Sequence, residues 1–186
     1  MMAKKVRKLQ QLIPRLHRVG ITHKKLPLVL KILKTQKTTH LIDVRYSTLY
    51  KSKQGFSPQH LEKVLGQANI TYTYYQKLGN PFHREFTQKL KTAINPKEIR
   101  QVHDEARQEY LNFIRSERKN LIQLIFKKIA HTRATKEDHF CFMCYCDTSN
   151  PLRCHTYWLI EEMINLKRVE LDLPPDYQLP IPMEEN

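Results

Sequence analysis

Glycine is scarce in this chain of 186 residues, which has only four, and they are scattered. A P-loop or a dinucleotide-binding loop needs several glycines within a few residues, so both are excluded. No run of eighteen apolar residues occurs, which excludes a membrane-spanning helix. The N-terminus has no continuous apolar stretch of the kind that secretory signals carry, so we expect a cytoplasmic protein that does not bind a membrane.

Acidic residues are missing from the first 42 positions, which hold eleven lysines and arginines. The whole chain has 32 Lys and Arg against 18 Asp and Glu, for a net charge of +14, and the acids gather toward the C-terminus. A basic surface attracts phosphate polyanions and releases their counterions. The charge therefore predicts a nucleic acid or a nucleotide as partner, and the alternative is a solvated basic face that serves solubility.

Cysteine is absent outside a stretch of fourteen residues that contains Cys141, Cys144, Cys146 and Cys154. A secreted domain held by disulfides would spread its cysteines along the chain. The clustering instead favours reduced thiols, either in the core or at a site.

Apolar patterning alternates between short strands and helices. Strands are predicted near 16–21, 40–45, 70–75 and 139–146, with a possible last one at 169–171, and helices lie between them. Such alternation predicts a single three-layer Rossmann-like α/β domain, with a mostly parallel sheet of four to five strands and helices on both faces. We expect this domain over 16–173, a basic arm over 1–15, and a proline-rich acidic tail over 174–186.

Ligands of such sheets bind beyond the carboxyl ends of the strands, which selects three loops. In the first, Asp43 and Arg45 share one strand face, and the arginine is placed to hold a phosphate or carboxylate. Ser47 and Lys51 could add donors. The alternative is a structural Asp43–Arg45 pair with a solvated loop beyond it.

The second loop follows the tyrosine-rich strand. Tyr75 could stack on a base or serve as core, and Gly79 is expected to take a positive φ or to let a ligand approach its backbone. Asn80 follows as a further polar candidate for the same anion site.

The third loop joins Cys144 and Cys146, at the end of an apolar strand, to Cys154 and His155, at the start of a helix. A helix N-terminus favours anions and lowers the pKa of a thiol. We therefore take Cys146, Cys154 and His155 as catalytic candidates, and Cys144 as a binding candidate. Because Cys154 and His155 are adjacent, they diverge on a helix, which disfavours a direct dyad between them.

Three sulfurs and one imidazole also suit tetrahedral zinc. Their spacing is unusual for a structural zinc site, and cysteines on an apolar strand are more often core residues. We therefore predict no metal and no cofactor, and keep a thiol or zinc protein as an alternative.

The segments Asp43–Arg45 (DVR) and Cys154–His155 (CH), with a loop ending in GFS and an aromatic strand before LG, resemble domain-of-unknown-function family 488. The resemblance runs from about residue 18 to 171. It implies a compact Rossmann-like α/β protein, and its activity is not settled. The shared residues gather at strand ends, and in this chain they are Asp43, Arg45, Phe56, Leu78, Gly79, Cys144, Cys154 and His155.

The chain departs from the family pattern in three places. Cys146 stands where the family usually has a glutamate, Thr156 replaces a basic residue, and Asn80 replaces a glycine. Loss of the carboxylate removes a general acid or base. The sequence therefore does not decide whether the protein is an enzyme. The favoured hypothesis is that the strand-end anion pocket binds or processes a nucleic acid or nucleotide, and the alternative is a non-catalytic nucleic-acid-binding or regulatory module.

Overall fold

The computed structural model describes residues 15–48, 55–131, 138–146 and 154–170. Four strands form in this part of the chain: β1 (Leu16–Gly20), β2 (His40–Asp43), β3 (Thr71–Tyr74) and β4 (Phe140–Cys144). The helices are α2 (Leu26–Thr35), α3 (Pro58–Gln67), the short 3₁₀ helix η3 (Gln76–Leu78), α4 (His83–Thr92), α5 (Pro96–Glu117), α6 (Lys119–His131) and α7 (His155–Glu170).

The four strands make one parallel sheet in the order β1-β4-β2-β3, which confirms the predicted α/β class. The chain places β1, β2 and β3 in one direction and then returns to insert β4 between β1 and β2. The ends of β2 and β4 therefore lie side by side, although about a hundred residues separate them in sequence. The loops that follow these two strands leave toward opposite faces of the sheet.

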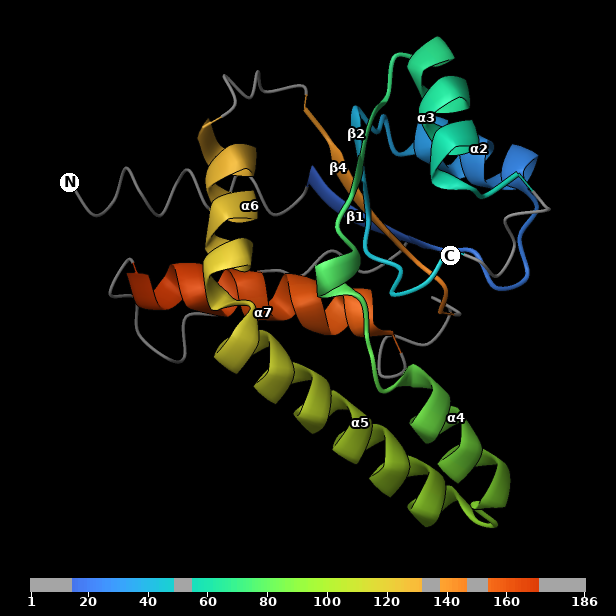
Figure 1. Cartoon of the computed structure of the whole chain (residues 1–186), viewed down its shortest axis with the longest axis vertical. Helices are drawn as coiled ribbons and strands as arrows, with labels where there is room; N and C mark the ends of the chain where they lie inside the picture. The colour runs from blue at the N-terminus through green and yellow to red at the C-terminus, as the bar shows by residue number, and fades with distance from the viewer. Residues whose placement is uncertain (1–14, 49–54, 132–137, 147–153, 171–186) are drawn as a thin grey trace.

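Two apolar cores lie on the two faces of the sheet and make the fold three-layered (Figure 1). Helices α2 and α3 cover one face, where they bury residues such as Val29 and Leu65. Helices α5, α6 and α7 cover the other. Because side chains alternate along a strand, Cys141 of β4 faces the α2–α3 core and Cys144 faces the α5–α7 core.

Local sequence signals explain where two of the helices begin. Ser57 caps α3 by accepting a hydrogen bond from the His60 backbone, and Pro58 follows at the first helical position. At α5, the Asn95 side chain accepts from the Glu98 amide and Glu98 accepts back from the Ile94 amide. This reciprocal arrangement resembles a capping box and satisfies donors that the helix leaves open.

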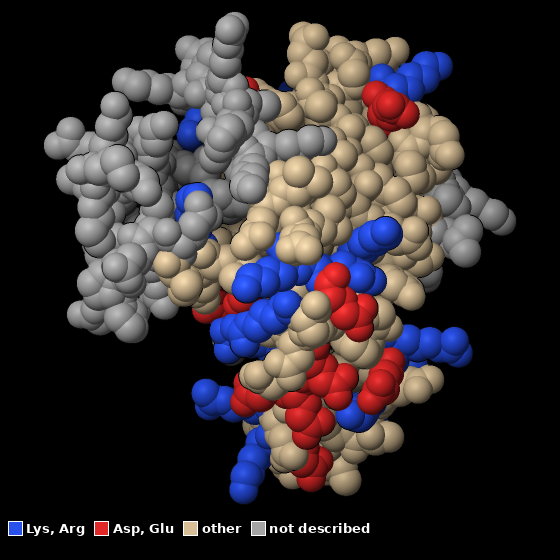
Figure 2. Space-filling view, turned by 60° about the vertical axis from the view of Figure 1, so that its left-hand side comes forward, with Lys and Arg blue, Asp and Glu red and all other residues tan. Residues whose placement is uncertain are grey.

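Acidic and basic side chains are unevenly placed on the surface. Figure 2 shows most of the acidic residues of that view on the lower lobe of the molecule, mixed with basic ones, and Figure 1 places α4 and α5 there. Helix α2, by contrast, contains lysines and no acidic residue.

The predicted fifth strand is wrong, because residues 169 and 170 belong to α7. Val169 favours a strand by its branched side chain, but α7 continues through it and leaves Val169 exposed. Residue 171, most of the predicted basic arm and the acidic tail lie outside the described residues.

Candidate functional site

The candidate site lies where the carboxyl ends of β2 and β4 meet. The chain passes from β2 to α3 on one face and from β4 to α7 on the other, so these neighbouring ends form a topological switch point. Open α/β sheets place their ligands at such points. The motif around Asp43 and the loop that follows Cys144 therefore come together, as the positions of Asp43 and Cys144 at strand ends predicted.

Asp43 and Arg45 form a buried ion pair. The Arg45 Nη2 donates to Asp43 Oδ2 at 2.6 Å and Nε donates to Oδ1 at 2.9 Å, while the relative exposures of the two side chains are 1% and 0%. Nη2 also donates to the Phe56 carbonyl at 2.8 Å. The geometry thus shows the structural pair that the sequence left as an alternative.

One nitrogen of Arg45 is left over. Its Nη1 is buried and has no hydrogen-bond partner among the described residues. The other donors face Asp43 and Phe56, so a contact with an external anion would fall to this nitrogen. Anion binding by Arg45 stays a prediction.

Tyr72 completes the buried polar group, although the sequence did not place it in the site. Its hydroxyl donates to Asp43 Oδ2 at 2.7 Å. The pKa of Tyr72 is raised, first because the side chain is buried and second because the carboxylate of Asp43 disfavours a phenolate beside it. Strand alternation, which places Tyr72 and Tyr74 on the same face of β3, is a sequence signal that could have drawn attention to Tyr72.

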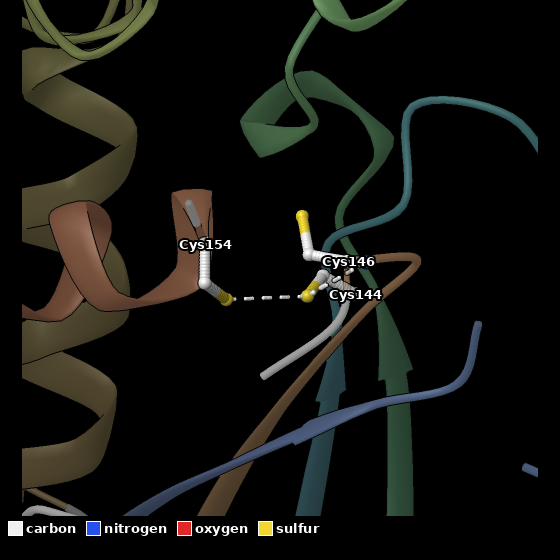
Figure 3. A group of neighbouring side chains, drawn as sticks. All are labelled: Cys144, Cys146 and Cys154. Atoms are coloured by element: carbon white, nitrogen blue, oxygen red, sulfur yellow. Dashed lines mark hydrogen bonds between the residues drawn. The ribbon is translucent and has the colours of Figure 1, made fainter. Parts of the chain in front are cut away.

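Three thiols gather at the end of β4. The Sγ atoms of Cys144, Cys146 and Cys154 all lie within 4.8 Å of one another, and those of Cys144 and Cys154 are 3.6 Å apart (Figure 3). All three side chains are buried and none is in a disulfide. Thr156, which the sequence did not select, places its hydroxyl 2.8 Å from the Cys154 Sγ.

The thiols differ in their proton affinity. Burial raises the pKa of Cys154, but hydrogen bonds from Cys144, Cys146 and Thr156 and the nearby His155 outweigh it and hold the pKa well below its usual range. Burial is the main reason why the pKa of Cys144 is raised. The contacts around Cys154 therefore favour its thiolate, and burial disfavours that of Cys144.

His155 links the thiols to the Asp43–Arg45 segment. Its Nε2 lies 3.4 Å from the carbonyl oxygen of Val44, and its Nδ1 lies 3.0 Å from the Cys146 Sγ. A carbonyl only accepts, so Nε2 carries the proton and Nδ1 presents its lone pair to Cys146. Burial lowers the pKa of His155, which favours this neutral form.

The ring of Tyr110 packs edge-on against His155, with their centroids 5.5 Å apart. The Tyr110 hydroxyl donates to the Leu78 carbonyl at 2.7 Å, which fixes the ring. Sequence reasoning missed Tyr110 because it lies on a long helix whose packing partner could not be read from its own pattern.

The remaining candidates have other roles in the structure. The prediction that Gly79 takes a positive φ is wrong, since its φ is −67°. The absence of a side chain at Gly79 makes room for the backbone of Tyr46. The Asn80 side chain accepts a hydrogen bond from the Phe82 amide, and the Tyr75 amide donates to the Asp43 carbonyl.

Ser47 is exposed on the loop that follows β2. Lys51 lies outside the described residues. Catalytic roles for Cys146, Cys154 and His155, like binding roles for the other candidates, stay predictions.

Comparison with known proteins gives a family and no further relative. The model of the family described as Domain of unknown function DUF488 matches residues 25–163. The chain belongs to this family. No curated protein and no solved structure matches the chain. In the part of the DUF488 protein that the structure describes, no helix combines the length and the apolarity needed to cross a membrane.

Proposed function

We propose that this DUF488 protein binds nucleic acid, without catalysis, through the basic outer surface of α2. The observation that carries the proposal is a set of four exposed lysines on and beside this helix, none of which forms an ion pair with another described residue. We call this set the α2 lysine surface, and it consists of Lys25, Lys31, Lys34 and Lys37.

The α2 lysine surface follows from the pattern of the helix. Val29 and Leu33 are buried against the sheet, which turns Lys31 and Lys34 outward. Residues three apart on a helix are neighbours on its surface, so Lys31 and Lys34 add their positive charges to the same part of it. Like charges held together in this way repel one another, and a phosphate backbone relieves that repulsion.

The missing acids support a polyanion as the partner. No acidic residue precedes Asp43, and Asp43 itself is buried against Arg45. The charge of the α2 lysine surface is therefore not neutralised by its own segment of the chain. Phosphate contacts of this kind do not read the base sequence, so the binding we expect depends strongly on salt and weakly on sequence.

The buried state of Arg45 supports this surface over the strand-end group as the place of contact. Most of its donors face Asp43 and Phe56, and the neighbouring His155 and cysteines are buried as well. Lysines that face water can meet a phosphate backbone without any rearrangement of the core.

The test is fluorescence anisotropy of a labelled DNA duplex and a labelled RNA, titrated with the full chain at several salt concentrations. The test variant is Lys31→Gln/Lys34→Gln. The matched control is Lys91→Gln/Lys97→Gln, which removes the same charge from exposed lysines of α4 and α5, two helices that also carry acids such as Glu85 and Glu98.

We expect the α2 variant to weaken binding and to reduce the slope of log K against log salt by about 1.8, since each duplex phosphate contact contributes about 0.9. The control should change the affinity much less. An equal loss in both variants would show a dependence on net charge alone, and an unchanged affinity of the α2 variant would remove this surface from the function.

A further inference from the structure

We propose that Cys144, Cys146 and Cys154 bind a zinc ion as thiolates, with His155 Nδ1 as the fourth ligand. This site is independent of the α2 lysine surface. It rests on the meeting of three sulfurs from two segments of the chain, the end of β4 and the start of α7 (Figure 3), and on the His155 Nδ1 that lies 3.0 Å from one of them, the Cys146 Sγ.

The distances suit tetrahedral coordination. Zinc–sulfur bonds of about 2.3 Å give a tetrahedron whose sulfur–sulfur edges are about 3.8 Å. The Cys144 and Cys154 sulfurs are 3.6 Å apart, and the Cys146 sulfur lies within 4.8 Å of both. A zinc ion can therefore join the three with side-chain adjustments of an ångström or less at the most distant pair.

His155 presents the right atom. Its Nδ1 is the unprotonated nitrogen, because Nε2 faces the carbonyl oxygen of Val44. Metal-bound imidazoles commonly use their second nitrogen to donate to a backbone carbonyl, which fixes the ring and the tautomer. Nδ1 is 3.0 Å from the Cys146 sulfur, close to the sulfur–nitrogen edge of about 3.6 Å that tetrahedral zinc requires.

Donor groups face the sulfurs of Cys144 and Cys154, which offsets part of the cost of burying a thiolate there. The Cys146 amide donates to the Cys144 Sγ at 3.3 Å, and the Thr156 hydroxyl is 2.8 Å from the Cys154 Sγ. Cys154 also occupies the N-terminal end of α7, where its carbonyl accepts the amides of Tyr157 and Trp158. Amide and hydroxyl donors with a helix N-terminus provide the environment that lowers the cost of a negative sulfur.

Burial favours a metal in a structural role. Three thiolates, a neutral imidazole and zinc leave one net negative charge. All four ligand side chains are buried, as in closed structural sites rather than in catalytic ones that keep an open position. Zinc here would tie the first turn of α7 to the end of β4.

Cys141 supplies a control within the same strand. It is buried like the others but faces the α2–α3 core, on the opposite side of the sheet. Cys141→Ala and Cys154→Ala therefore remove the same group from the same kind of environment, and only the second removes a proposed ligand.

The experiment uses the full chain, purified under reducing conditions, with metal content measured by mass spectrometry and with cobalt(II) as a spectroscopic probe. We expect one zinc per chain, and for the cobalt form a thiolate-to-metal charge-transfer band together with intense visible bands of tetrahedral cobalt. Cys141→Ala should keep both signals and Cys154→Ala should lose them. His155→Ala should keep the charge-transfer band but bind cobalt at least tenfold more weakly.

Several outcomes would overturn the proposal. Wild-type protein that takes up neither metal, or that binds cobalt without a charge-transfer band, contradicts thiolate ligation even if every variant fails to fold. A disulfide between Cys144 and Cys154 that persists under reducing conditions would also exclude the zinc site. Equal metal loss in Cys141→Ala and Cys154→Ala would indicate a folding effect, and unchanged cobalt affinity in His155→Ala would remove the imidazole from the ligand set.

Discussion

Arg45 and Asp43 hold each other in a bidentate ion pair that is closed to solvent on all sides, with the shortest contact at 2.6 Å. Removing one partner leaves the other charge buried and uncompensated, which typically costs about 3–5 kcal/mol. We therefore expect Arg45→Ala to lower the free energy of unfolding by about that amount. Urea denaturation at neutral pH, followed by circular dichroism, measures it.

The exposed pair between Arg107 and Glu161 is the control for Arg45. Its nitrogen–oxygen distance is 2.7 Å, nearly that of the buried pair, but both side chains reach solvent. Exposed ion pairs contribute about 0–1 kcal/mol, so Arg107→Ala should have a small effect. Similar losses from the two substitutions would show that burial does not govern the strength of the Asp43–Arg45 pair.

Tyr72 contributes to the same buried group through one hydroxyl. Tyr72→Phe removes the 2.7 Å hydrogen bond to Asp43 and leaves the ring in place. Hydrogen bonds to charged groups are worth about 1.5–3 kcal/mol, and we expect a loss near the lower end because the Tyr72 side chain is only partly buried. Urea denaturation measures the loss, and Tyr46→Phe, on a ring that is 52% exposed, should change stability by less than about 0.5 kcal/mol. A Tyr72→Phe protein as stable as the wild type would contradict the contact.

The sequence predicted the meeting of the two main motifs because of one property of parallel sheets. Their strands end at the same edge, so Asp43 and Cys144, each the last residue of a strand, had to lie on one side of the molecule. Strand order was not predictable, since nothing in the local pattern of β4 shows that it inserts between β1 and β2.

The fate of individual side chains was less predictable, because it depends on groups distant in sequence. Arg45 was a candidate to hold an anion, with a structural pair to Asp43 as the alternative. Most of its donors face Asp43 and the carbonyl of Phe56, eleven residues away, and Nη1 is left without a partner among the described residues. Cys154 and Cys144 were known to be close in sequence, yet their 3.6 Å contact depends on how α7 packs on the sheet.

Gly79 owes its place to a close approach of backbone. A Cβ atom there would lie 2.3 Å from the Tyr46 amide nitrogen, and backbone cannot yield as a flexible side chain can. We expect Gly79→Ala to lower the free energy of unfolding by about 1–3 kcal/mol. Because its φ is −67°, backbone strain contributes nothing to this loss.

Gly66 is the matched control for Gly79. It lies near the end of α3, and a Cβ atom there would meet nothing within 4 Å. Gly66→Ala should raise the free energy of unfolding by about 0.4–1 kcal/mol, since alanine restricts the unfolded chain and favours the helix. Thermal denaturation of both variants should therefore move the melting temperature in opposite directions, and shifts of the same sign would contradict the packing described for Gly79.

His17 and His139 predict how stability responds to acid. Their rings stack with centroids 5.2 Å apart, and His17 Nε2 lies 2.9 Å from His139 Nδ1. Burial, followed by the nearby His139, lowers the pKa of His17 to about 4. The unfolded chain, with a histidine pKa of about 6.5, binds the proton first. The stability from neutral His17 is thus complete above about pH 6.5 and is lost as the pH falls toward about 4.

His17→Gln should therefore weaken the pH dependence of unfolding, because glutamine does not titrate. The free energy of unfolding, measured in urea at about pH 7 and about pH 5, should fall less on acidification in the variant than in the wild type. The lowered pKa values of His83, His139 and His155 leave a residual slope in both proteins. An acid titration of the His17 imidazole, followed by NMR in the wild type, provides a direct check. A titration midpoint near pH 6.5 would mean that folding does not lower the pKa of His17. The free energy of unfolding would then depend on pH equally in His17→Gln and in the wild type, which would contradict the prediction.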